Sequence, residues 1–140
     1  MKRLRQSDAY IPELSLVAED EKGTLVGHIL LSKVQVVSEE NTALLLGVAP
    51  LSVLPDYQRK GIGSLLMREA HKRASELGYK GALLIGHKEY YPRFGYQKAS
   101  LYGIQFPFEA PDDCCMAIEL QEGGLQGIHG MVHYSSAFYE

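Results

Sequence analysis

In the first half of the chain, apolar positions alternate with polar ones or run continuously, and this pattern predicts β-strands. An alternating segment at 14–19 is followed by turn-forming residues at 20–23 and a long β-rich stretch at 24–37. Together they predict a hairpin. A third apolar segment, 42–54, contains Pro50. Because proline cannot donate a backbone hydrogen bond to a neighbouring strand, we expect this strand to bend near its middle.

A helical period follows this β pattern. Between residues 61 and 77, apolar side chains recur three or four positions apart and charged ones fall largely on the other face, which predicts an amphipathic helix. Gly78 is suited to end it. The wholly apolar run 81–86 predicts a strand buried on both faces. Residues 89–94 predict a short helix, which Gly95 would end.

Two last strands are predicted at 102–108 and 114–120, whereas the glycine-rich tail 121–140 has little periodicity. This order of elements indicates an α/β (α+β) fold, in which helices cover both faces of a mixed sheet. We expect one domain over residues 1–140, with its core at about 10–120.

Charge and composition exclude several classes of function. The formal net charge is −3 at pH 7, which argues against a general nucleic-acid binder because such proteins need a basic excess. No apolar run approaches the roughly 18 residues of a membrane helix, and the N-terminus lacks an apolar signal core. Cys114 and Cys115 are adjacent, so a disulfide between them would be strained and they cannot alone build a metal site. We expect a reduced, cytoplasmic protein without a metal.

The segment from Gln58 to Ser64 predicts an anion site. It joins a strand to the first turn of a helix through a glycine-containing turn, so free backbone N–H groups and the positive end of the helix dipole meet there. A P-loop is excluded because no lysine followed by serine or threonine comes after the second glycine. A dinucleotide fingerprint is excluded because Leu66 stands where its third glycine belongs. A plain tight turn stays possible.

The spacing Gln58-x-x-Gly61-x-Gly63 resembles the Q/R-x-x-G-x-G/A signature of the GNAT superfamily, the acetyl-CoA-dependent N-acetyltransferases. In that family the amides of this turn hold the pyrophosphate of coenzyme A. The resemblance implies a cofactor site made of Gln58, Arg59, Lys60, Gly61, Ile62, Gly63 and Ser64.

Two further segments carry the same resemblance, which covers roughly residues 10 to 120. The sequence Leu51-x-Val53-x-Pro55-x-Tyr57 is similar to the strand end that precedes the family's turn. Residues 90–96, Tyr-Tyr-Pro-Arg-Phe-Gly-Tyr, resemble its aromatic-Tyr-x-x-x-Gly-aromatic segment. The implied fold is a mixed, mostly antiparallel sheet in which a splayed pair of strands holds the cofactor.

The resemblance also implies roles in acetyl transfer from acetyl-CoA to a primary amine, by direct attack in a ternary complex. The backbone N–H of Leu51 would face the thioester carbonyl, and Val53 would hydrogen-bond the pantetheine arm. Tyr91 matches the tyrosine that donates a proton to the coenzyme A thiolate, a sensible role for a phenol. Tyr90 is the second candidate, and a packing role for Tyr91 stays open.

The general base is where this chain departs from the family. Several members place a glutamate four residues before the oxyanion amide, and here that position is Gly47. Glu39 and Glu40 lie in the preceding loop, and His28 lies within the predicted hairpin. His87 follows the strand 81–86 and can accept a proton near neutral pH, although it could equally cap the next helix. Deprotonation through water is a further alternative.

A second departure lies at the N-terminus, where only about ten residues precede Pro12. The family begins with a strand and one or two helices that shape the amine site. The chain is therefore either truncated or completed by a partner, and we expect a homodimer or higher oligomer. A non-catalytic acyl-CoA-binding or sensing module is the alternative function, and a structural domain holding an unrelated anion is a third. The amine acceptor is not identified.

Overall fold

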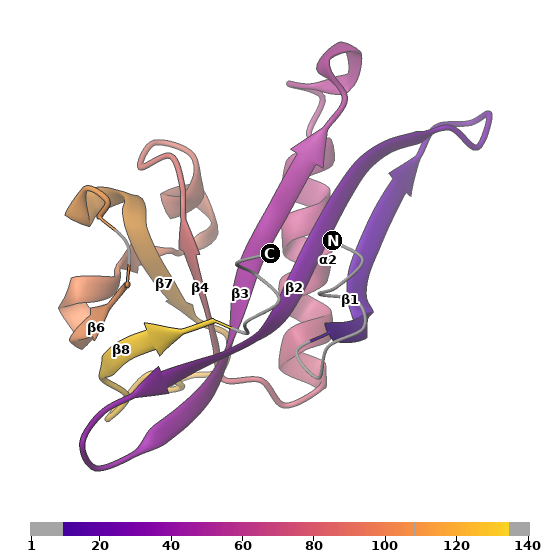
Figure 1. The fold of residues 1–140 in the computed structure, drawn as a ribbon. Coiled ribbons are helices and arrows are strands. Elements are labelled where there is room, and N and C mark those ends of the chain that lie inside the picture. Colours follow the sequence, from indigo (N-terminus) through magenta and orange to yellow (C-terminus); the bar gives the residue numbers. More distant parts are fainter. Residues whose placement is uncertain (1–9, 108, 135–140) are drawn as a thin grey trace.

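The computed structural model describes residues 10–107 and 109–134. Its longest strands are β1 (Tyr10–Glu19), β2 (Leu25–Val37) and β3 (Thr42–Val53), which pair antiparallel in sequence order (Figure 1). The predicted hairpin is confirmed. Its turn is held by the Asp20 carboxylate, which accepts the backbone N–H groups of Lys22 and Thr24, each at 2.9 Å.

A β-bulge interrupts β3 where Pro50 stands. Leu51 pairs with Ile29 and Val48 pairs with Leu31, so three steps along β3 face two steps along β2. A proline has no N–H to give to the ladder, and an extra residue at this point relieves the mismatch. The bend predicted from Pro50 is confirmed. The extra residue also shifts the alternation along β3, so that beyond the bulge the other set of residues turns its N–H and C=O groups toward β2.

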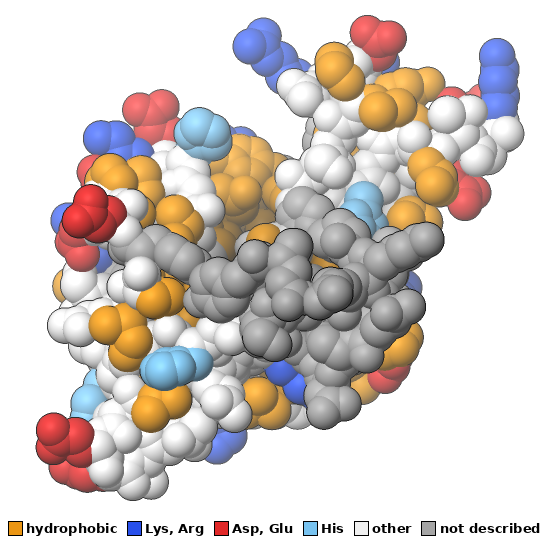
Figure 2. All heavy atoms as spheres, in the orientation of Figure 1, with side chains coloured by type: hydrophobic (Ala, Val, Ile, Leu, Met, Phe, Trp, Pro, Cys, Tyr) orange, Lys and Arg blue, Asp and Glu red, His pale blue; other side chains and the backbone are white. Residues whose placement is uncertain are grey.

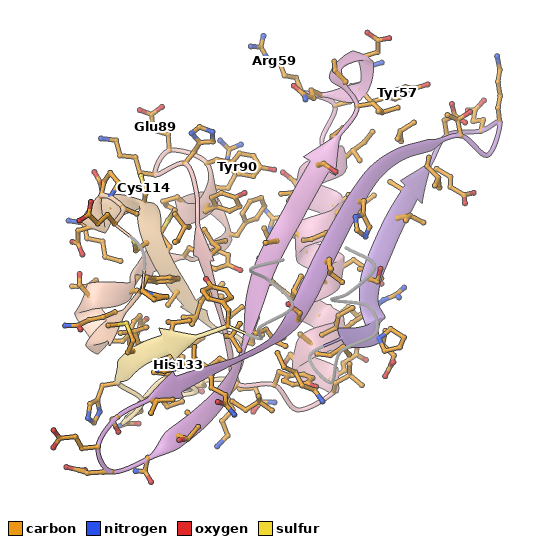
Figure 3. All side chains as sticks on the ribbon, in the orientation of Figure 1. Tyr57, Arg59, Glu89, Tyr90, Cys114 and His133 are labelled. Carbon is orange, nitrogen blue, oxygen red and sulfur yellow. The ribbon has the colours of Figure 1, made fainter. Side chains whose placement is uncertain are left out.

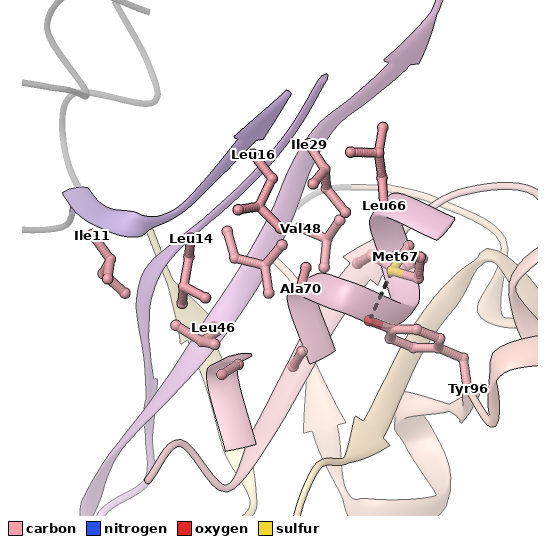
Figure 4. Close-up of a cluster of buried hydrophobic side chains, with 14 of the residues drawn as sticks. Ile11, Leu14, Leu16, Ile29, Leu46, Val48, Leu66, Met67, Ala70 and Tyr96 are labelled. Atoms are coloured by element: carbon pink, nitrogen blue, oxygen red, sulfur yellow. Dashed lines mark hydrogen bonds between the residues drawn. The ribbon is translucent and has the colours of Figure 1, made fainter. Parts of the chain in front are cut away.

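One α-helix, α2 (Ile62–Glu76), packs on one face of the sheet. Its buried residues are Leu66, Met67, Ala70 and Ala74. They join side chains from β1, β2 and β3 in the larger hydrophobic core (Figure 4). The two alanines let the helix backbone come close to the sheet, and Gly78, at φ 95°, follows the helix end as expected.

The strand β4 (Gly81–Ile85) lies parallel to β3 over a short stretch only. Leu46 pairs with Ala82 and Gly47 pairs with Leu83, after which the two strands diverge and open a V between them (Figure 1). On its other side β4 pairs antiparallel with β7 (Cys115–Glu119). The part of β3 that follows Gly47 is therefore not paired with β4.

Three short strands complete the sheet: β5 (Gln97–Lys98), β6 (Ile104–Gln105) and β8 (Gly130–His133). The order is β5-β7-β4-β3-β2-β8-β6, with β1 also paired to β2. Among the strands of the described residues, only the pairs β3–β4 and β6–β8 are parallel, so the sheet is mixed and mostly antiparallel.

Helices were expected on both faces of the sheet, and this is only partly correct. Among the described residues α2 is the one α-helix. The second face buries its own cluster, to which Leu83, Ala99, Ile104 and Leu125 belong. It is closed by the 3-10 helix η3 (Ala99–Tyr102) and by the turns around Leu125 rather than by a second long helix.

One expectation for the C-terminal third is wrong. Over the described part of the strand predicted at 102–108, only β6 forms, because Ala99–Tyr102 form a 3-10 turn that Gly103 ends at φ 77°. The tail beyond residue 120, for which no element was predicted, buries Leu125 and supplies β8, which pairs with β2 and β6. No helix among the described residues is long and apolar enough to cross a membrane.

Candidate active site

The turn after β3 has an unusual backbone. It begins with the 3-10 helix η1 (Pro55–Tyr57), and the Gln58 side-chain amide donates to the Val53 carbonyl at 3.0 Å. Arg59 adopts φ 66° and Gly61 adopts φ 84°. Glycine accepts this conformation without cost, whereas a positive φ in arginine stores strain of the kind found at ligand sites.

The N-terminus of α2 presents unpaired donors at the end of this turn. The N–H of Leu65 donates to the Gly61 carbonyl at 3.0 Å, the first helical hydrogen bond. The N–H groups of Ile62, Gly63 and Ser64 precede it, and the Gly61 cap position makes no side-chain cap hydrogen bond. Three aligned donors and the positive end of the helix dipole form a site for an anion such as a phosphate group.

The free end of β3 directs backbone donors into the V. The N–H of Leu54 donates to the Val26 carbonyl of β2 at 2.9 Å. Because hydrogen-bonding groups alternate along a strand, the backbone N–H groups of Leu51 and Val53 face the opposite side, where β4 has diverged. They can bind an extended ligand as a neighbouring strand would, or an oxygen that carries developing negative charge.

Tyr91 lies across the V from this strand end, at the start of η2 (Tyr91–Phe94). Its ring packs against Gly86, where a Cβ atom would overlap the ring. It also makes edge contacts with the rings of Tyr90 and Tyr96, at centroid distances of 5.0 and 6.0 Å. Glycine at position 86 thus makes room for the tyrosine.

Burial raises the pKa of Tyr91 above its ordinary value, and the neighbouring Tyr90 adds to the effect. The phenol therefore keeps its proton at neutral pH. A protonated phenol beside a site of developing negative charge can serve as a general acid.

The outer wall of the turn is anchored to the β1–β2 hairpin. The Tyr57 hydroxyl donates to Asp20 Oδ2 at 3.0 Å. The Thr24 N–H is the main group that holds the pKa of Asp20 below its ordinary value, and the Tyr57 and Lys22 donors contribute less. Lys60 Nζ lies 5.3 Å from the centre of the Tyr57 ring, a cation–π contact.

These segments enclose one cavity of about 570 Å³, here named the turn cleft. The surface is hollowed between the two arms of the V (Figure 2). Arg59 extends from one arm and Tyr90 lies on the other, whereas the Tyr57 hydroxyl points toward the β1–β2 hairpin (Figure 3). The turn cleft is lined by residues of β3, the turn, α2 and the segment after β4: Leu51, Val53, Tyr57, Gln58, Arg59, Gly61, Gly63, Ser64, His87, Tyr90, Tyr91 and Arg93.

Most of the residues expected at the site lie together in this cleft. The exceptions are Lys60, which lies over Tyr57, and Ile62, whose side chain packs against the core. Two lining residues were not expected to bind ligand, Tyr57 and Arg93. Both occur within the segments that drew attention to the site, but no spacing rule distinguishes them from packing residues.

The candidate bases separate clearly. Glu39 and Glu40 lie in the loop at the far end of β3 from Leu51. His28, within β2, lies 3.4 Å from the Ser15 hydroxyl. His87 is exposed and lines the turn cleft.

Position 47, where the resemblance would place a glutamate, is closely packed. A Cβ at Gly47 would lie 3.0 Å from Val34 Cγ1 and 3.5 Å from Tyr134 Cε1, so a side chain there would need Val34 to shift. Within the described residues, no group of three or more His, Cys, Asp or Glu side chains could hold a metal ion.

Sequence comparison places this geometry among known proteins. A family model described as the acetyltransferase (GNAT) domain matches residues 12–98. The uncharacterized N-acetyltransferase YjhQ of Escherichia coli (strain K12) is 34% identical over 111 residues, which are 79% of this chain and 61% of YjhQ. The uncharacterized N-acetyltransferase YhbS of the same strain is 29% identical over 125 residues, 89% of this chain and 74% of YhbS. The chain thus spans about three fifths of one relative and three quarters of the other.

Two solved structures share the fold over nearly the whole chain. The YhbS structure from Escherichia coli, a complex with CoA, has a TM-score of 0.89 and 26% identity over 99% of this chain and 75% of that one. A GNAT family acetyltransferase from Brucella melitensis, in complex with acetyl-CoA, has a TM-score of 0.75 and 30% identity over 98% of this chain and 74% of that one.

Proposed function

Because this chain belongs to the GNAT acetyltransferase domain family, we propose that it binds acetyl-CoA in the turn cleft and transfers the acetyl group to a primary amine. One observation carries the proposal: the anion-binding turn, the free donors of β3 and Tyr91 border the same cavity. We also propose that residues 1–140 form a single domain.

The turn suits the diphosphate of coenzyme A. The N–H groups of Ile62, Gly63 and Ser64 would hydrogen-bond its oxygens, and Arg59 and Arg93 line the same cleft. A hydrogen bond to a charged group contributes about 1.5–3 kcal/mol. The summed free energy of several such bonds is reduced by the cost of association. The remaining affinity suits a cosubstrate that must leave after each turnover.

The free edge of β3 suits the rest of the cosubstrate. Val53 would pair with the amides of the pantetheine arm, and the Leu51 N–H would bind the thioester oxygen. That oxygen gains negative charge when the carbonyl is attacked, so a fixed donor stabilises the transition state more than the ground state.

The reaction then follows from the groups on either side. The lone pair of a neutral amine forms a bond to the carbonyl carbon, and the C–S bond breaks with its electron pair on sulfur. The Tyr91 hydroxyl gives its proton to the departing thiolate. The proton that the amine loses passes to His87 or directly to water, since Gly47 supplies no carboxylate.

A non-catalytic acyl-CoA-binding or sensing module is the second candidate. One observation favours it: Gly47 stands where several family members place a glutamate, and a Cβ there would contact Val34 and Tyr134. Such a module would bind acetyl-CoA through the same cleft without releasing its thiol.

Two measurements test these proposals. We expect acetyl-CoA and CoA, but not the dephosphorylated pantetheine arm alone, to raise the unfolding temperature strongly. We also expect acetyl-CoA-dependent thiol release in the presence of a primary amine. Binding without release under any amine would favour the sensing module, and absence of binding would refute both.

We also propose that the protein is a homodimer or higher oligomer. In the described part of the chain, β1 pairs with β2 alone, so its outer edge can accept a further strand. Sedimentation at micromolar concentration tests this, and a monomer would contradict it.

A further inference from the structure

A second cavity borders the turn cleft from behind. The β4–β7 cavity, of about 700 Å³, is formed by the segment that leaves β4 and the segment that enters β7, and includes Ile85, Glu89, Pro111 and Cys114. His87 lines both this cavity and the turn cleft. A third cavity, of about 650 Å³, lies at the opposite end of β3 and shares no lining residue with the turn cleft.

The wall between the two neighbouring cavities is one backbone segment thick. Gly86 lines the β4–β7 cavity, and the Tyr91 ring, which lines the turn cleft, packs directly on Gly86. An occupant of the second cavity would therefore lie on the other side of this segment from the proposed acid, with His87 at the edge that the two cavities share.

The two cavities open on opposite faces of the sheet. Ala82 and Leu84 belong to the core on the α2 side, whereas Leu83 belongs to the other core. Side chains alternate along a strand, so Ile85 points to the face away from α2. Leu51 and Tyr91 pack against the core on the α2 side. Acetyl-CoA bound in the turn cleft would leave this second face of the sheet free for the amine.

The chemistry of the β4–β7 cavity suits a particular kind of amine. Ile85 is a large hydrophobic residue with 40% of its surface exposed, and Pro111 and Cys114 add further weakly polar wall. Lys88 and Asp113 form an ion pair at 3.3 Å, so their charges cancel. Glu89, which lies near Cys114 on this arm (Figure 3), leaves one net negative charge at the rim.

We propose that the β4–β7 cavity is the acceptor site and takes a primary amine on an apolar body with no second charge, such as an arylalkylamine or alkylamine. This rests on the proposed acetyl transfer. The apolar body would cover Ile85, and Glu89 would attract the ammonium group. The ammonium loses one proton to water, directly or through His87, before its nitrogen attacks the thioester.

The test uses the full chain with 2-phenylethylamine and hexylamine, and with spermidine as a polycationic competitor. Ile85→Ser removes apolar wall and Glu89→Gln removes the charge. Leu44→Ser and Glu76→Gln are matched controls, since Leu44 is 49% exposed beside the distant third cavity and Glu76 is exposed at the end of α2. Each protein is assayed for the KM of the amine and of acetyl-CoA.

We expect Ile85→Ser to raise the KM of phenylethylamine about tenfold, and Glu89→Gln to raise it about threefold. The KM of acetyl-CoA should not change, and the two controls should behave as wild type. An unchanged amine KM in both variants, or a clear preference for spermidine, would overturn the proposal.

Calorimetric titration of phenylethylamine into CoA-saturated protein separates this proposal from the proposed catalysis. Binding that Ile85→Ser weakens, without turnover of any amine, would support the site while refuting acetyl transfer. Turnover that Ile85→Ser leaves unaffected would support acetyl transfer and refute the site. If CoA itself does not bind, the same titration of the free protein still shows whether the β4–β7 cavity binds the amine.

Discussion

The Tyr96 hydroxyl lies 2.8 Å from His71 Nε2, in a hydrogen bond that ties α2 to the segment carrying Tyr91. Tyr96 is fully buried and stacks edge-on against Tyr91, and its hydroxyl also approaches Met67 Sδ at 4.0 Å (Figure 4). Since α2 begins at the anion-binding turn, this pair connects the two sides of the turn cleft through the core.

Burial, with a smaller contribution from Arg68, lowers the pKa of His71 to about 4. An unfolded histidine binds its proton near pH 6.5, so between these values the unfolded chain holds a proton that the folded protein does not. The contribution of His71 to the free energy of unfolding should therefore be fully present above pH 6.5 and should be lost as the pH falls to 4. The loss is on the order of 3 kcal/mol.

The variant His71→Gln isolates this effect, because an amide can still hydrogen-bond Tyr96 but does not titrate. Urea unfolding at pH 7.0 and pH 4.5 should show a smaller loss of stability for the variant than for wild type. Equal losses would mean that carboxylates alone determine the acid sensitivity.

Replacing Tyr91 tests the proposed acid directly. Tyr91→Phe keeps the ring contacts with Tyr90 and Tyr96 but removes the proton, so we expect kcat to fall about a hundredfold or more with little change in CoA affinity. Tyr90→Phe is the matched control in the same cleft. If Tyr90→Phe causes the larger loss, the acid is Tyr90.

Local chemistry made the turn after β3 and the free end of β3 predictable. Pro50 marked the bulge, and the glycines of the turn marked a helix start with free donors. Each of these features depends on a few consecutive residues, so it can be recognised in the sequence. The long strands and α2 followed from periodicity in the same way.

The parts that could not be predicted depend on pairing between distant segments. The strand β8 is four residues long and is stabilised by β2 and β6 rather than by its own pattern. The β4–β7 cavity exists because Ile85 pairs with Cys115, which brings together loops that look unrelated in the sequence. Such contacts leave no local signal.

The positive side chains of the turn should contribute unequally to CoA binding. Arg59 lines the turn cleft, whereas Lys60 lies over the Tyr57 ring and outside it. We expect Arg59→Ala to weaken CoA binding about threefold to tenfold at low salt, and less as salt is added. Lys60→Ala should change it little. Calorimetric titration of both variants measures this, and an equal loss would place both side chains on the phosphates.

Gly86 should matter through the tyrosine that packs on it. Its backbone conformation suits any residue, so Gly86→Ala adds only a methyl group, which would overlap the Tyr91 ring. We expect the ring to shift and kcat to fall at least about tenfold, because small displacements of a catalytic group are costly. CoA affinity should stay near wild type. In the double variant with Tyr91→Phe, the alanine should cause little further loss, since the hydroxyl it displaces is already absent. An undiminished further loss in that background would show that Gly86 acts on something other than Tyr91, such as the path of the amine around His87.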